Sequence, residues 1–306
     1  MSIDRIVSSI SYRDFLEDLS ATRRRIETAS REVSSARRIN FPSDDPTNIS
    51  NLLQVKDALA QLDQFGRNAG AAKALLSFTD SLLDSAVNLM NVVVQRGVAA
   101  ATDTQSVQSR RAAGDEITVI RDQILNLANS SFQGSYIFGG QQSSTPPFAI
   151  SGGVVTYNGD SGVNLVDIGP GLSSPTNIPG NQVFTISGND LFAALGNLIT
   201  ALKTPAPSPP GPTQTVQITT AMATIARSFE QFRTTRAQIG SYLGVVDRAK
   251  QLLDNQRLHL VSSISAIEDT NMADSIANLV REQTVESATL GVGARIPRRT
   301  LFDFIG

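Results

Sequence analysis

Apolar side chains in the C-terminal third of the chain recur with alternating steps of three and four residues. A mean step of about 3.5 residues keeps them on one seam of an under-wound helix that can supercoil against a partner. We therefore expect a long coiled-coil helix here, with Arg236, Lys250 and Arg257 as polar positions that fix the register. The expected seam consists of Met222, Ile225, Phe229, Phe232, Arg236, Ile239, Leu243, Val246, Lys250, Leu253, Arg257, Leu260, Ile264 and Ile267.

A second seam near the N-terminus mirrors the first. It consists of Tyr12, Phe15, Leu19, Thr22, Ile26, Ala29, Val33 and Ala36. Two seams at opposite ends of a chain suggest that its ends meet in one helical bundle and that the middle is an insertion carried on that bundle. Long helices with polar breaks in their seams usually serve assembly rather than catalysis.

Prolines and capping residues divide the N-terminal part into three expected helices. Pro42 and Pro46 end the first helix. Asp45 before Pro46 predicts the N-cap of a second, long helix, since proline is tolerated at the first helical position. Thr102 followed by Gln105 has capping-box spacing and predicts the start of the third helix.

The composition changes after about residue 134, where glycine, proline, asparagine, serine and threonine become frequent. Short apolar segments at 154–157, 165–168 and 183–186 lie between turn signals and predict a small β-rich domain. A short helix is expected at 191–202. The proline-rich run 205–212 predicts a stiff, extended linker.

The C-terminal seam is interrupted at Glu268–Asn271, and Asn271 predicts the N-cap of a last helix. This helix carries Ile276, Val280 and Leu290. The chain then ends in the apolar segment 301–305. Because an apolar tip is costly to leave in water, we expect a partner to bury it.

Composition excludes several classes of function. Hydrophobic residues make up 41% of the 306 residues but aromatic residues only 6%, which predicts a core of aliphatic side chains. A net charge of −2 argues against nucleic acid as a partner. Without cysteine, disulfides, zinc–thiolate sites and a cysteine nucleophile are excluded. No apolar run approaches the ~20 residues that span a bilayer, and no cleavable signal peptide is expected.

Three motifs are similar to parts of known catalytic or metal-binding sites. Residues 159–162, Gly-Asp-Ser-Gly, are similar to a serine-protease nucleophile segment, but they are also good turn residues. The single histidine, His259, follows this serine and lies in a helical pattern, so it is poorly placed as a base. Asp44 and Asp45 lack the alternating oxygen ligands of a calcium loop, and we interpret them as capping residues. We expect no catalytic residue, metal or cofactor.

Several segments resemble the flagellin superfamily. Residues 37–46, Arg-Arg-Ile-Asn-Phe-Pro-Ser-Asp-Asp-Pro, lie between the first and second helices, as the hallmark of that family does. Residues 134–140 with 146–148 are similar to the segment where hook-associated proteins of this family leave their third helix. Residues 301–304 resemble the C-terminal end of these proteins. The motif residues are Arg38, Ile39, Asn40, Asp44, Asp45, Pro46, Tyr136, Phe138 and Gly139.

The resemblance implies a mainly α fold with a β-rich insertion, in which the two ends of the chain form a flagellin-like antiparallel coiled-coil bundle. The terminal helices 1–44 and 269–306 would form an inner layer that is disordered in the monomer. Residues 45–134 and 213–268 would form the coiled coil. Residues 135–204 would form the outer domain.

The resemblance also implies a structural role in the bacterial flagellum, as an adaptor between hook and filament. Expected partners are neighbouring axial proteins, other copies of the chain in a ring, and an export chaperone at the C-terminal helices, without nucleic acid or membrane. Export through the flagellar type III channel would place the protein outside the cell. The expected assembly residues are Ile3, Ile6, Ile10, Ile276, Val280, Leu290, Leu301, Phe302 and Phe304.

Two alternatives remain open at this point. A filament flagellin would have similar helical ends, and mainly the segments 136–148 and 301–304 argue against it. A hydrolase or glycan-binding domain on a coiled-coil stalk is disfavoured by the absence of a defensible acid–base pair, although glycan binding by the outer domain stays open.

Overall fold

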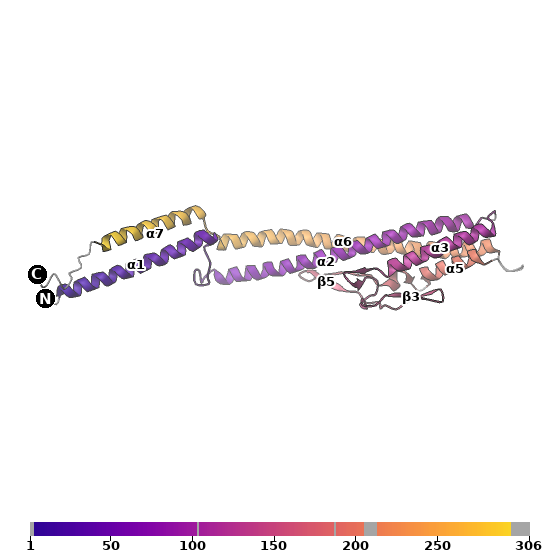
Figure 1. Cartoon of the computed structure of the whole chain (residues 1–306), viewed down its shortest axis with the longest axis horizontal. Coiled ribbons are helices and arrows are strands. Elements are labelled where there is room, and N and C mark those ends of the chain that lie inside the picture. The colour runs from indigo at the N-terminus through magenta and orange to yellow at the C-terminus, as the bar shows by residue number, and fades with distance from the viewer. Residues whose placement is uncertain (1–2, 103, 187, 205–212, 295–306) are drawn as a thin grey trace. The chain divides into compact units, whose positions relative to one another are not determined.

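The computed structural model describes residues 3–102, 104–186, 188–204 and 213–294, and the side chains of residues 3–12 fall outside this description. The chain divides into two compact units. One contains Met1–Gln61 with Arg257–Gly306, and the other contains Leu62–Gln256. The expected fold class, mainly helical with a β-rich insertion, is confirmed (Figure 1). The expected division into terminal, coiled-coil and outer domains stays a prediction.

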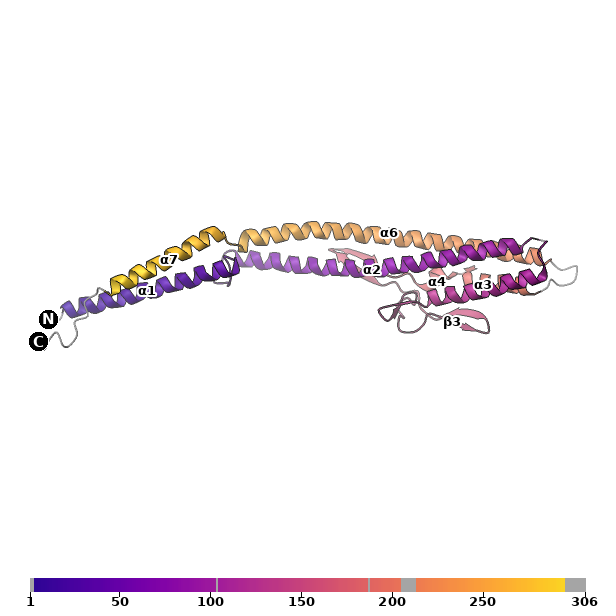
Figure 2. The same cartoon turned by 45° about the horizontal axis from the view of Figure 1, so that its top comes forward.

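Two long helices, α2 and α6, dominate the fold, and α7 lies along α1 in both views (Figures 1 and 2). The expected short helix at 191–202 is confirmed as α5, which packs on α3. The helices are α1 Ile3–Ser35, α2 Ile49–Ala100, α3 Val107–Ala128, α4 Gly180–Val183, α5 Leu191–Lys203, α6 Gln214–Glu268 and α7 Met272–Gly293.

The strands of the described residues form four two-stranded antiparallel sheets between α3 and α5. The expected strands at 154–157 and 165–168 are confirmed as β4 and β5. The strand expected at 183–186 is partly wrong: Gly180–Val183 form α4, and only Thr185–Ile186 pair as a strand. The strands are β1 Ser131–Phe132, β2 Ser135–Tyr136, β3 Phe148–Ser151, β4 Val154–Tyr157, β5 Leu165–Gly169, β6 Leu172–Pro175, β7 Thr185–Ile186 and β8 Asn189–Asp190.

The helix starts follow local capping chemistry. Asn271 caps α7, because its side-chain oxygen accepts a hydrogen bond from the Ala273 N–H. Asp45 caps the turn that leads into α2, since its Oδ1 accepts from the Asn48 N–H at 3.1 Å. The cap predicted at Thr102 is wrong. Ser106 caps α3 instead, by accepting from the Ser109 N–H.

The seam of α6 has the predicted period up to Leu253, but four of its positions are shifted by one residue. Beyond Leu253 the seam is not buried: Arg257 is exposed, and Leu260, Ile264 and Ile267 are half-buried. Ile225, Phe232, Ile239, Val246 and Leu253 are buried as expected. Between them, Ala221, Ser228, Thr235 and Ala249 are buried in place of the predicted Met222, Phe229, Arg236 and Lys250. Tyr242 and Leu243 are both half-buried. From Ile218 to Leu253 the observed seam consists of Ile218, Ala221, Ile225, Ser228, Phe232, Thr235, Ile239, Tyr242, Val246, Ala249 and Leu253.

At Arg236 the shift has an electrostatic reason. The Arg236 guanidinium lies beside the seam, where its Nε is 2.9 Å from Asp80 Oδ1 and its Nη1 is 2.6 Å from Asp84 Oδ1, both on α2. These carboxylates raise the pKa of Arg236, with the hydrogen bond to Asp80 as the largest cause. Lys250 is exposed. Arg236 therefore fixes the pairing of α2 and α6 from the flank of the seam.

The outer segment is anchored by an aromatic cluster that the low aromatic content did not suggest. The Phe184 ring packs at 5.1 Å from Phe138 and 5.2 Å from Phe232, edge to face in both cases. Phe148 and Phe192 complete the cluster. All five rings are buried. The β-rich segment is thus joined to α6 by the kind of ring contacts that stabilise cores beyond their area.

Candidate assembly site

The N-terminal seam of α1 faces α7, as its period predicts. Phe15, Leu19, Ile26 and Val33 are half-buried, and Thr22 and Ala29 are buried. Ala36, the last predicted position, is exposed. Gly293 packs directly against the Phe15 ring at the end of the pair, where a Cβ would require that ring to move. Tyr12 lies outside the described side chains.

The face that α7 turns toward α1 combines the half-buried Leu279 with polar side chains. Ser275 is buried, and its hydroxyl lies 2.7 Å from that of Thr270. Two ion pairs join the helices farther along. Arg25 Nε is 3.0 Å from Glu282 Oε2, and Arg23 Nε is 3.0 Å from Glu286 Oε1. Both arginines are mostly exposed, so each pair contributes at most about 1 kcal/mol.

A flank of α7 beside this face carries apolar side chains that are open to solvent. Ile276 is 47% exposed, Val280 55% and Leu290 45%. A helix that packs within a finished monomer normally turns its apolar stripe inward. Here the three side chains lie outside the contact with α1 and are exposed, so three of the expected assembly residues can contact another molecule.

The other expected assembly residues lie where the structure gives no side-chain information. Ile3, Ile6 and Ile10 belong to α1, but their side chains are outside the described residues. Leu301, Phe302 and Phe304 lie wholly outside them. Their role in assembly stays a prediction.

The family-like segment 37–46 builds the junction between α1, α2 and α6. The N–H groups of Arg38 and Ile39 donate to the Glu268 carbonyl at the end of α6, and the Thr270 N–H donates to the Ala36 carbonyl at 3.1 Å. Ile39 is buried. The Arg38 guanidinium donates to the Ile267 carbonyl at 2.9 Å and to Asp45 at 3.0 Å. The segment therefore holds the end of α6 at the start of α7.

A buried carboxylate, that of Glu268, also lies in this junction. The sequence analysis did not predict its role. The Glu268 side chain is only 4% exposed. Its two oxygens lie 3.1 Å from Arg37 Nη1 and 2.8 Å from Lys56 Nζ. The available signal was a glutamate one residue after the seam residue Ile267. Nothing in the local pattern pairs that glutamate with a lysine on α2.

Asp44 and Asp45 act as capping groups within the same junction. The Asp44 Oδ2 accepts from the N–H groups of Asn40 and Phe41 at 2.9 and 2.8 Å. These hydrogen bonds, with that from Phe41 the larger cause, lower the pKa of Asp44. Hydrogen bonds from the side chain and the N–H of Asn48 lower the pKa of Asp45. Both carboxylates therefore accept hydrogen bonds within the turn and stabilise it.

The remaining motif residues, Tyr136, Phe138 and Gly139, belong to the other unit. The Phe138 carbonyl accepts from the Tyr157 hydroxyl at 3.0 Å, and burial raises the pKa of Tyr157. Asp160 closes the adjacent loop. Its Oδ1 accepts from the Gln141 and Gly162 N–H groups, and these hydrogen bonds lower its pKa. This motif folds the start of the outer segment.

The Gly-Asp-Ser-Gly turn is built from hydrogen bonds rather than arranged for catalysis. The Ser161 hydroxyl accepts from Asn181 Nδ2 at 2.6 Å. His259 lies near the C-terminal end of α6, in the other unit. In the part of the chain that the structure describes, no three His, Asp or Glu side chains gather as a metal site. Among the described helices, none is long and apolar enough to cross a membrane.

Paired terminal helices joined through a capped loop to a long two-helix coiled coil define a protein of flagellin-like fold. Residues 6–143 match the family described as the bacterial flagellin N-terminal helical region. Flagellar hook-associated protein 3 of Salmonella typhimurium is 26% identical over 304 residues, which cover 93% of this chain and 94% of that protein.

Two further comparisons cover different shares of the chain. Flagellin B of Helicobacter pylori is 29% identical, but over only 118 residues, or 38% of this chain and 23% of the flagellin. The crystal structure of FlgL from Xanthomonas campestris aligns with a TM-score of 0.62 at 21% identity. The alignment covers 69% of this chain and all of that one. The chain is homologous to flagellar hook-associated protein 3, a flagellar structural protein.

Proposed function

We propose that this chain is a structural adaptor at the junction between the flagellar hook and filament. The observation that carries the proposal is the apolar face of α7, which the paired terminal helices leave open to solvent. Homology to hook-associated protein 3 along nearly the whole chain supports the junction as its place. In this proposal the protein acts by assembly and catalyses no reaction.

The partners follow from this position. Copies of the chain would associate with one another in a ring, with a neighbouring hook-associated protein on one side and flagellin on the other. A chaperone would bind the C-terminal helices before export. The protein would work outside the cell, after export through the flagellar type III channel.

The assembly interface would be the α1–α7 pair, including Ile276, Val280 and Leu290. We further propose that the terminal helices 1–44 and 269–306 become ordered only on assembly. Ordering costs about 1–2 kcal/mol per backbone residue, and the contact between α1 and α7, which leaves most of its apolar side chains only half-buried, offsets only part of this cost. Trypsin should therefore cut the free monomer at Arg13 within the pair, while assembled protein resists.

Electron microscopy of the purified chain with isolated hooks tests the adaptor role. The protein should form short caps on hook ends, on which added flagellin then grows. The variant Ile276→Asp should keep the melting temperature of the monomer, since the side chain is exposed, but should lose the caps. Val119→Asp is a matched control, because Val119 is an exposed valine on α3. Normal caps from the Ile276 variant would remove α7 from the interface.

The second candidate is a filament subunit, and the flagellin-type match of residues 6–143 favours it. The same microscopy separates the two functions. Long filaments formed by this chain alone would replace the adaptor by a flagellin, whereas caps that stop after a short layer support the adaptor.

A further inference from the structure

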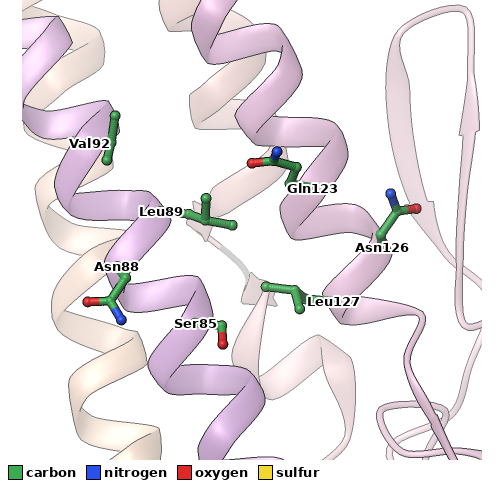
Figure 3. A pocket seen from close by; sticks show the side chains of 7 residues that line it. All are labelled: Ser85, Asn88, Leu89, Val92, Gln123, Asn126 and Leu127. Atoms are coloured by element: carbon green, nitrogen blue, oxygen red, sulfur yellow. The ribbon is translucent and has the colours of Figure 1, made fainter.

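An open groove runs between α2 and α3 in the second unit. Its volume is about 600 Å³, within the range of ligand pockets. Leu89, Val92 and Leu127 form its floor, and the polar ends of Ser85, Asn88, Gln123 and Asn126 form its rim (Figure 3). The core beneath it is complete without any occupant, since Met90 and Ile124 on the same helices are fully buried.

The chemistry of the lining narrows the possible occupants. None of the seven lining residues is charged, so the groove offers no cation for a phosphate or an acidic peptide. None is aromatic, so it offers no ring on which a sugar could stack. Three aliphatic side chains flanked by amides fit an uncharged segment of polypeptide, whose apolar side chains would cover the floor and whose backbone would bond the rim.

The same chain exposes a segment of this kind. Between Gln141 and Gly159 there is no charged residue. The β3–β4 hairpin lies within this stretch, with Ser151 paired to Val154 at its tip. Gly152 and Gly153 have φ of +59° and +84°, as a two-residue hairpin turn with the strand twist requires. Val154 is 64% exposed.

The base of this hairpin is held firmly while its tip is open. Asn129 donates to the Phe148 carbonyl and accepts from the Phe148 N–H, each at 2.9 Å. By contrast, a Cβ added at Gly152 or Gly153 would meet nothing within 4 Å. An anchored hairpin loses little conformational freedom when its tip binds, which favours association.

From these features we infer that the β3–β4 tip of one copy of this chain docks in the α2–α3 groove of the next. The hairpin is narrow enough for the groove. Ser85 and Val92 are about 10 Å apart along α2, whereas the two paired strands of a hairpin are only about 5 Å apart. A groove and a tip are different surfaces on one chain, so their contact is heterologous and propagates into a ring or helix. The inference specifies the copy-to-copy contact of the proposed ring and rests on that proposal.

Cysteine cross-linking tests the contact in the full-length protein, because the chain has no native cysteine. Asn126→Cys on the groove rim is mixed with Val154→Cys on the tip under mild oxidation, at high protein concentration and on hook ends. The mixture should give at least roughly ten times more mixed dimer than the control pair Val119→Cys with Val154→Cys, the ratio set by about 1.4 kcal/mol of specific contact.

A charge exchange provides the second measurement. Asn126→Glu and Val154→Lys, both on exposed residues, should each reduce cross-linking or ring formation, and a mixture of the two variants should restore it. Normal rings from both variants, or equal dimer yields from the test and control pairs, would overturn the inference. Intact rings on which flagellin no longer grows would also overturn it, because they would make flagellin the occupant of the groove.

These outcomes are separable from the adaptor role. Caps on hook ends without the specific cross-link would leave the adaptor standing and remove the groove contact. The specific cross-link in solution without caps would leave the contact standing and remove the adaptor.

Discussion

Glu268 is the one buried carboxylate of the junction between α1, α2 and α6, and replacing it by glutamine should loosen that junction selectively. The glutamine has nearly the same volume, but only one of its two polar ends accepts a hydrogen bond. If its oxygen faces Arg37, its NH₂ group faces Lys56 Nζ, which lies 2.8 Å from the carboxylate in the parent. One charge-assisted contact is lost and a donor is set against a donor.

The magnitude follows from burial. Breaking a fully buried ion pair costs about 3–5 kcal/mol. Arg37 and Lys56 are 56% and 41% exposed, so water can solvate them after the change. We therefore expect a smaller loss, about 2 kcal/mol, in the range of one hydrogen bond to a charged group.

Hydrogen exchange measures this loss at the junction itself. The Arg38, Ile39 and Thr270 N–H groups donate across the junction, so their exchange reports its local opening. A loss of about 2 kcal/mol should speed their exchange roughly 30-fold. Asp247→Asn is the matched control. It breaks the Lys73–Asp247 pair, whose side chains are 47% and 45% exposed, and should change stability by less than about 0.5 kcal/mol.

The reasoning would be refuted if Glu268→Gln changed exchange at these amides by less than about threefold, a free energy near that of one exposed pair. A uniform increase across the whole chain would also count against it, because the loss would then be global rather than confined to the junction.

Three further predictions concern the other unit and chain folding. Val246→Asp should lower the unfolding free energy in urea far more than Leu243→Asp, because Val246 is fully buried and Leu243 only partly; equal losses would restore the original phase of the seam. Phe184→Ala should cost about 3–5 kcal/mol in the same assay, since four rings pack on it or beside it, and a loss under about 1 kcal/mol would contradict the anchoring role. The pKa of Asp160 is lowered by the Gln141 and Gly162 N–H groups, so its contribution is present above the unfolded value and is lost as pH falls through the lower folded value. Asp160→Asn should flatten stability between about pH 4 and the folded pKa, and an unchanged acid profile in a urea-denaturation series would refute this.

The coiled-coil seam illustrates how far sequence reasoning reaches. The 3.5-residue period of α6 was readable because apolar residues recur at Ile225, Ile239 and Val246, and these positions are buried. The phase of the alternate positions was not readable. At one of them, Asp80 and Asp84 of α2 hold Arg236 beside the seam, and the smaller Thr235 is buried within it. A pattern within one helix contains no information on a charge contributed by another.

The same limit explains the misplaced cap. Thr102 and Ser106 are both acceptable N-cap residues. Arg110, buried on α3, donates to the carbonyls of Ala100 and Thr102, and these contacts draw the end of α2 and the loop onto α3. The helix therefore starts at Val107 after Ser106. The position of the N-cap thus depends on the contacts of Arg110 and not on the N-cap preference of Thr102 or Ser106 alone.

At the candidate assembly site, the apolar face of α7 was predictable but its direction was not. Ile276, Val280 and Leu290 form a stripe in the sequence, and an isolated amphipathic helix would be expected to bury such a stripe in its own monomer. The face that contacts α1 instead carries Glu282 and Glu286, whose ion pairs with Arg25 and Arg23 join residues more than 250 positions apart in the chain. The contact between α1 and α7 leaves these apolar side chains exposed to water, which is unfavourable for an isolated monomer. It is well suited to a subunit whose terminal helices gain their main stabilisation from the next molecule, and this is the physical reason to place assembly at α7.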